Sequence, residues 1–142
     1  PHPPVPMVPA QTPAQLRAAL LSRADSVRLS WSPTQDPGGA GVSGDLVWNP
    51  ATQSGVMRFV GMAGNDPAAH QYQLWIFDAE RDQRYPVDGG VFNVPAGGRE
   101  VLVPIHAAVK VHRPTLFAVT REQPGGVVVS QREHILVTAG SG

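Results

Sequence analysis

The feature that most constrains the fold of this chain is the run Gln71–Asp78, with the sequence QYQLWIFD. Tyr72, Leu74 and Ile76 occupy alternate positions, and more polar or mixed residues lie between them. Successive side chains of a β-strand point to opposite faces, so this period of two predicts a strand with one apolar and one mixed face. If both faces bury apolar groups, the strand is central to its sheet.

Other short runs predict further strands of the same kind. Asp45–Trp48 predicts a strand that ends at Asn49-Pro50, because proline cannot donate to a sheet and Asn-Pro favours a turn. Further strands are predicted at Val27–Trp31, Val56–Gly61, Gly90–Val94, Glu100–Ile105, Leu116–Arg121 and Ile135–Thr138, with Val127–Ser130 as another strand or extended edge.

Glycine and proline mark the connections between these runs. The chain has 15 of each, and the segment Ser32–Gly44 is predicted to be a long loop. Asp88-Gly89-Gly90 is predicted to be a turn. Short strands separated in this way predict a mainly β fold, an antiparallel β-sandwich of about 7–9 short strands with one short N-terminal helix.

The N-terminal residues differ from the rest in composition. Residues 1–11 contain five prolines and no apolar periodicity, which predicts a disordered, proline-rich leader or tether. Residues 12–142 are predicted to form a single β-sandwich domain.

A short helix is predicted to follow the leader. Thr12 can cap it, Pro13 suits its first position, and Gln15 can complete a capping box. The helix should run from Pro13 to about Ala24. Its predicted docking face consists of Leu16, Ala19, Leu20 and Ala24.

The composition excludes several classes of function. Lys+Arg and Asp+Glu number 11 each, so the formal net charge is zero, which argues against nucleic acid as a partner. There is no cysteine, which excludes cysteine-ligated metal sites and thiol catalysis. No apolar run is long enough to span a membrane, and no signal-peptide pattern is present.

Candidate catalytic and metal-binding residues lack the spacing that their chemistry needs. No pair of histidines is placed to share a metal, although His106 and His112 flank a loop and could converge. Ser43 lies among glycines but not in a nucleophile elbow. The acidic segment Asp78–Asp82 lacks the glycine and closing glutamate of a calcium loop, and is expected to be a solvated hairpin tip. We therefore expect no enzyme, no cofactor and no metal.

Two interpretations of the aromatic residues stay open from the residues alone. The predicted strands carry three tryptophans, Tyr72 and four phenylalanines. Most should pack between sheets, but an exposed row could bind carbohydrate or peptide.

Four stretches, in this order, resemble a known module. They are Val47–Gly55, Tyr72–Ile76, Gly89–Phe92 and Phe117–Gly126. The motif residues within them are Trp48, Asn49, Pro50, Gly55, Tyr72, Gln73, Leu74, Trp75, Gly90, Phe92, Thr120, Glu122, Pro124, Gly125 and Gly126. With these residues the chain resembles the extracytoplasmic C-terminal domain of the anti-sigma-K factor family. The resemblance covers about Asp45–Ala139, and the helix and loop before Asp45 have no counterpart in it.

The resemblance implies a regulator, with the motif residues specifying the fold and not catalysing a reaction. It implies a sensory domain of a membrane-anchored anti-sigma factor, on the extracytoplasmic face of the bacterial cell membrane, either periplasmic or at the cell surface. An extracytoplasmic-function (ECF) sigma factor would bind a cytoplasmic region of the protein outside this chain. A transmembrane helix, also outside this chain, would anchor the protein in the membrane. Site proteases would cleave the protein and so release the sigma factor. The alternative is a free-standing carbohydrate- or peptide-binding β-sandwich module.

Overall fold

The computed structural model describes residues 11–97 and 99–140, which form two antiparallel sheets and one α-helix. The first sheet, sheet A, has the strand order β1-β3-β4-β7. The second, sheet B, has the order β2-β9-β8-β5-β6. Among the described residues there are nine strands, so the predicted mainly β sandwich with a short N-terminal helix is confirmed.

The elements have the following bounds. They are α1 (Pro13–Leu21), β1 (Val27–Ser30), β2 (Ser32–Pro33), the 3-10 turn η1 (Pro37–Gly39), β3 (Ser43–Asn49), β4 (Ser54–Val60), β5 (Gln71–Asp78), β6 (Val87–Phe92), β7 (Glu100–Pro104), β8 (Pro114–Glu122) and β9 (Ile135–Gly140).

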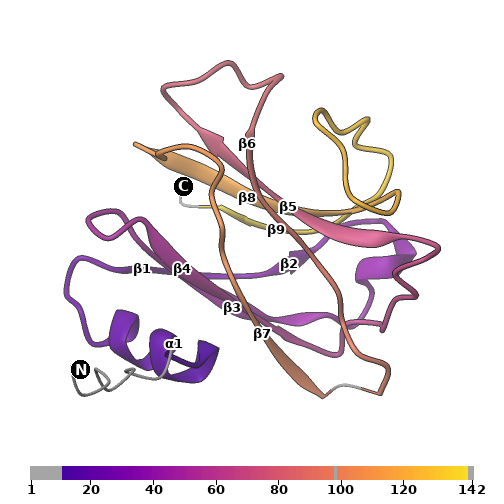
Figure 1. Cartoon of the computed structure of the whole chain (residues 1–142), viewed down its shortest axis with the longest axis horizontal. Coiled ribbons are helices and arrows are strands. Elements are labelled where there is room, and N and C mark those ends of the chain that lie inside the picture. The colour runs from indigo at the N-terminus through magenta and orange to yellow at the C-terminus, as the bar shows by residue number, and fades with distance from the viewer. Residues whose placement is uncertain (1–10, 98, 141–142) are drawn as a thin grey trace, which may run out of the picture.

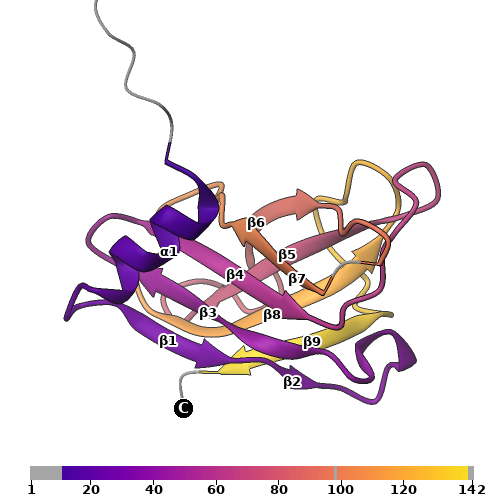
Figure 2. The ribbon, with the colours of Figure 1, turned by 90° about the horizontal axis from the view of Figure 1, so that it is seen from below.

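The molecule is arranged in layers. Figure 1 shows α1 on one side of sheet A and sheet B on the other side, with the loop after β8 beyond sheet B. Turned by 90°, the ribbon shows α1 lying across β3 and β4 (Figure 2). Each sheet therefore has an inner face toward the other sheet and an outer face with its own cover.

The inner faces of both sheets form the main core. It contains Leu46, Trp48, Met57 and Phe59 of sheet A and Tyr72, Leu74, Ile76, Phe117 and Val119 of sheet B, among others. A row of rings crosses it, with centroids 5.1 Å apart for Trp31–Phe59, 5.5 Å for Phe59–Phe92 and 5.7 Å for Tyr72–Phe92. The strand aromatics named from the sequence are buried or half-buried, and none forms an exposed row.

β5 has the character that its alternation predicts. It occupies Gln71–Asp78, as predicted, and lies between β8 and β6. Leu74 faces the main core, whereas Trp75 is buried on the opposite, outer face. Both faces are covered, so the strand is central.

Four of the sequence-based predictions differ from the structure, and the first two concern the end of α1 and the segment before β3. α1 ends at Leu21, where the Ser22 backbone N–H caps the carbonyls of Ala18 and Leu20. Ala24 therefore lies beyond the helix, and Ala19, within it, is exposed and not on the docking face. The segment Ser32–Gly44 is not all loop, because β2 pairs with β9 and η1 follows.

The third difference concerns the turn expected at Asp88–Gly90. This segment belongs to β6, and it contains the irregularity where β5 changes register between Leu74 and Trp75. Gly90 has φ +116°, and a Cβ at Gly89 would lie 2.6 Å from Leu74 Cδ2. The glycines therefore serve a bulge inside a strand and not a turn before one.

The fourth difference concerns Val127–Ser130, which is predicted to be another strand or an extended edge and forms no strand. The Val127 backbone N–H donates to Gln73 Oε1 at 3.0 Å, and Gln73 Nε2 donates to the Val127 carbonyl at 3.1 Å. A side-chain amide thus takes the place of a neighbouring strand.

Candidate functional site

The outer face of sheet A is the candidate functional site, because the N-terminal helix is held there by a buried charge. Asp45, on β3, is 2% exposed. Arg17 of α1 donates to both of its carboxylate oxygens, from Nη1 to Oδ1 at 2.7 Å and from Nη2 to Oδ2 at 3.1 Å. A bidentate arginine–carboxylate pair fixes orientation as well as distance.

Two further arginines complete the cluster around Asp45. Arg28 Nε of β1 lies 2.6 Å from Oδ2, and Arg58 Nε of β4 lies 3.2 Å from Oδ1. Arg58 Nη1 also binds Glu100 Oε2 of β7 at 3.1 Å. We call Asp45, Arg17, Arg28, Arg58 and Glu100 the Asp45 cluster. It joins α1 to all four strands of sheet A.

The charge state of Asp45 follows from these contacts. Burial alone raises the pKa of this carboxyl, but hydrogen bonds from Arg17, Arg28 and Arg58 and the charge of Arg17 outweigh it and lower the pKa to about 2. Asp45 is therefore ionised at neutral pH, and its negative charge attracts the helix.

Apolar contacts support the same docking. Leu20 is buried with Val47 and Val56 of the sheet, and Leu16 and Leu102 pack against this small cluster. Thr12 and Gln15 form the predicted capping box, with the Gln15 backbone N–H donating to Thr12 Oγ1 at 3.1 Å. The helix has only nine residues, and helices of this length are marginal in water without tertiary contacts. Helix α1 therefore depends on docking for its stability.

The chain after α1 is tied to the same sheet. Asn49, fully buried at the end of β3, donates from Nδ2 to Asp25 Oδ1 at 2.8 Å and to Ser26 Oγ at 3.0 Å. Its Oδ1 accepts from the Thr52 backbone N–H at 3.0 Å. One asparagine thus connects the β3–β4 turn to the segment between α1 and β1.

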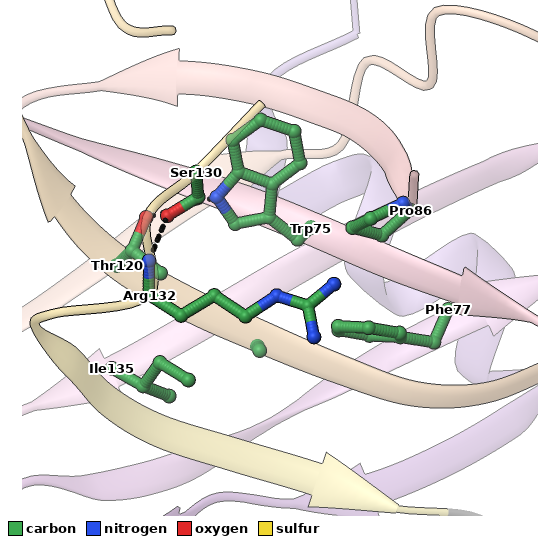
Figure 3. A pocket seen from close by; sticks show the side chains of 8 residues that line it. Trp75, Phe77, Pro86, Thr120, Ser130, Arg132 and Ile135 are labelled. Carbon is green, nitrogen blue, oxygen red and sulfur yellow. Dashed lines mark hydrogen bonds between the residues drawn. The ribbon is translucent and has the colours of Figure 1, made fainter. Parts of the chain in front are cut away.

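The outer face of sheet B has a different cover, the loop between β8 and β9. Trp75 Nε1 donates to Thr120 Oγ1 at 2.9 Å within this face. Figure 3 shows Ser130 and Arg132 of the loop beside the Trp75 ring, with Arg132 extending toward Phe77. The space enclosed there has a volume of about 10 Å³, enough for at most one water molecule. The space beside Trp75 is therefore packed and offers no room for a ligand.

The part of the chain that the structure describes contains no group of three or more His, Cys, Asp or Glu placed to hold a metal ion. Nor does any helix within it have the length and hydrophobicity needed to cross a membrane. The acidic segment after β5 is only partly a solvated tip, because the Asp78 carboxylate is buried and accepts from the backbone N–H groups of Glu80, His112 and Arg113.

Comparison with protein families identifies the domain. Residues 3–131 match the family model described as "Anti-sigma-K factor rskA, C-terminal". The chain belongs to this family. Comparisons with curated proteins and with solved structures gave no match.

The family match corrects the extent of the resemblance. It begins at residue 3 and not near Asp45, so α1 and the loop before β3 lie within the matched part of the chain. It ends at residue 131, which leaves β9 outside it. Membership in the anti-sigma-K factor family supports a role in an anti-sigma factor, and it implies a sigma factor as partner.

The motif residues named from the sequence lie in two groups. Trp48, Asn49, Pro50 and Gly55 belong to the β3–β4 hairpin, and a Cβ at Gly55 would lie 2.9 Å from Trp48 Cε3. The others, Tyr72, Gln73, Leu74, Trp75, Gly90, Phe92, Thr120, Glu122, Pro124, Gly125 and Gly126, belong to sheet B and the loop after β8.

Within sheet B the motif residues contact one another. Trp75 Nε1 donates a hydrogen bond to Thr120 Oγ1, and Gln73 Oε1 accepts one from the backbone N–H of Val127, next to Gly126. Gly126 has φ +76°, and a Cβ there would lie 2.8 Å from Gln73 Oε1, so this position requires glycine. The structure does not bring these residues together with the Asp45 cluster, which sequence analysis missed.

The sequence contains a signal for the Asp45 cluster, which the pairing of the predicted strands would have revealed. Asp45 and Arg58 are direct cross-strand partners in the β3–β4 hairpin, and Arg28 pairs with Val47, two positions along the same face. Counting back from the turn at Asn49-Pro50 would have placed a carboxylate opposite an arginine. Arg17 follows Leu16 and precedes Leu20 by three positions, so it lies beside the docking face of α1.

Proposed function

We propose that this domain is the extracytoplasmic regulatory domain of a membrane-anchored anti-sigma factor. In this proposal it contributes to negative regulation of an ECF sigma factor through regulated proteolysis, and it has no catalytic activity of its own. The sigma factor would bind a cytoplasmic region, and a transmembrane helix would anchor the protein, both outside these 142 residues. Family membership and the docked N-terminal helix support this function.

The observation that carries the mechanism is the attachment of α1 to sheet A through Asp45. A helix of nine residues loses its main stabilisation when it leaves the sheet. Proteases cleave extended, locally unfolded chain, and cleavage rates follow the population of the open form when opening is fast. Docking of α1 would therefore protect the chain at the N-terminal side of the sandwich, and undocking would expose it.

A reporter experiment tests this mechanism in the full-length protein. In cells with a reporter driven by the cognate sigma factor, Asp45→Asn should raise transcription, because an amide cannot hold three arginines as a carboxylate does. The matched control is Asp82→Asn, which removes an exposed carboxylate paired only locally with Arg84. Unchanged transcription from a protein whose α1 is demonstrably undocked would refute the mechanism.

Fractionation of cells tests the location and the partner. The native gene product should be membrane-bound, larger than this chain, and should co-purify with a sigma factor. A soluble secreted protein of about this size, with no sigma factor attached, would instead favour the alternative binding module.

A further inference from the structure

An apolar cavity opens between the two sheets, at the end of the sandwich that holds the β3–β4 turn. Its volume is about 150 Å³. Trp48 of β3 and Phe117 of β8 form its buried part, with ring centroids 6.3 Å apart, and Leu29 and Pro114 line it further out. Cavities of roughly this size and lining bind benzene-sized molecules.

Trp48, one of the residues that line this cavity, carries an unusual polar group. Trp48 is 1% exposed, and its indole Nε1 is, among the described residues, the only buried side-chain nitrogen or oxygen without a hydrogen-bond partner. The other two tryptophans have partners, since Trp31 Nε1 donates to the Arg58 carbonyl at 3.1 Å and Trp75 Nε1 to Thr120 Oγ1 at 2.9 Å. A buried N–H without an acceptor is costly, so an acceptor supplied from the cavity would be favourable.

The rim of the cavity limits the charge of what can enter. Val27, 41% exposed, and Pro50 and His112 line it there, and none of the described residues that line it is Asp, Glu, Lys or Arg. Among these lining residues a cation would have no partner of opposite charge and an anion only the imidazole of His112 at the rim, and burial of an unpaired charge is strongly unfavourable. The chemistry of the site thus fits a neutral molecule.

We propose that this cavity is a binding site for a small, neutral, largely apolar molecule of about six to eight heavy atoms that carries one hydrogen-bond acceptor, such as a ketone oxygen. The acceptor accepts a hydrogen bond from the Trp48 Nε1–H group, and the hydrocarbon part packs against Trp48, Phe117 and Leu29.

Such a site adjoins the segment that leads from α1 to sheet A. Val27 begins β1, and Asn49, next to Trp48, holds Asp25 and Ser26 of that segment. A bound molecule stabilises the folded state by mass action. The effect on sigma factor release rests on the proposed function, whereas binding itself does not.

The test compares two isosteric probes by nuclear magnetic resonance of the ¹⁵N-labelled 142-residue chain. Cyclohexanone carries a carbonyl oxygen where methylenecyclohexane carries a CH₂ group. Cyclohexanone should move the Trp48 indole N–H resonance downfield in a saturable way and leave those of Trp31 and Trp75 in place. It should bind about 10-fold more tightly than methylenecyclohexane, the difference that one neutral hydrogen bond makes.

Three variants separate this site from general adsorption. Trp48→Phe should reduce cyclohexanone binding to the level of methylenecyclohexane. Val27→Phe, at the exposed rim, should fill the cavity and abolish binding of both probes without requiring a change in the buried core. The matched control is Leu21→Phe, a similarly exposed leucine (40%) that does not line the cavity, and it should bind as the original chain does.

Three results would overturn the proposal. The first is the absence of a saturable shift, and the second is equal affinity for the two probes. The third is a nuclear Overhauser effect from the Trp48 indole N–H to a bound water molecule that cyclohexanone does not displace. None of them bears on the reporter experiment, so failure of this site and failure of the regulatory function are distinguishable.

Discussion

The two outer faces of the sandwich are covered by different means. On sheet A, α1 is held by the ionised Asp45 cluster and a small apolar contact around Leu20. On sheet B, the loop after β8 exchanges hydrogen bonds with the Gln73 amide and lies beside the buried ring of Trp75. Ser130 and Arg132 add contacts with Glu122, Gln83 and Phe77. The cover of sheet A is short and depends on charge, whereas that of sheet B is part of the packed fold. The comparison indicates that α1 can detach while the sandwich stays folded.

The largest effect is expected on sheet B. Trp75→Ala should lower the free energy of unfolding by about 3–5 kcal/mol, because it empties a fully buried site and leaves the Thr120 hydroxyl without its donor. Chemical denaturation measures this, and the loss should be global. Tyr85→Ala is the control, since Tyr85 is 51% exposed, and it should change stability by less than about 0.5 kcal/mol. If the loop after β8 alone lost its protection from hydrogen exchange and the denaturation midpoint stayed unchanged, the sheet B cover would also be detachable.

On sheet A the effect should be smaller and local. Asp45→Asn should lower the free energy of unfolding by about 2–3 kcal/mol. This is at or below the low end of what breaking a buried ion pair costs, because Arg28 remains 60% exposed to water and needs no partner. Hydrogen exchange should show faster exchange of the α1 amides, while β5 and β8 keep their protection. Equal loss of protection in α1 and β5 would contradict a detachable helix.

The different covers also explain what the sequence could predict. Alternation in Gln71–Asp78 and in Asp45–Trp48 depends only on local periodicity, and it predicted β5 and most of β3 correctly. The cap of α1 at Thr12 is equally local and was also predicted. These features need no knowledge of distant segments.

Features that depend on distant segments were missed. Val127 lies in a valine-rich run that suggests a strand, but the amide of Gln73, far away in the sequence, occupies its backbone groups. The docking face of α1 includes Arg17 and not Ala19, because its partner is a carboxylate on β3. Periodicity reports that a face is buried, and it does not identify the group that covers it.

Acid should weaken the cover of sheet A. Because the folded-state pKa of Asp45 is lowered to about 2 from its usual value of 3.8, its contribution to stability is fully present above pH 4 or so and is lost as the pH falls toward 2. The contribution is about 2 kcal/mol. The difference in stability between the original chain and Asp45→Asn should therefore shrink from pH 5 to pH 2.5. A difference that stays constant would show that the charge of Asp45 does not hold α1.

The smallest effect separates the arginines of the Asp45 cluster from one another. Arg17 makes the bidentate contact with a side chain only 14% exposed, whereas the Arg28 side chain is 60% exposed and binds through Nε. An exposed ion pair contributes about 0–1 kcal/mol, so Arg28→Gln should change the exchange rates of α1 little. Arg17→Gln should release α1 more, since it removes the only arginine of the cluster that the helix supplies. Equal effects of the two substitutions would mean that Asp45 mainly holds β1 to β3, and that the helix is retained by Leu16 and Leu20 alone.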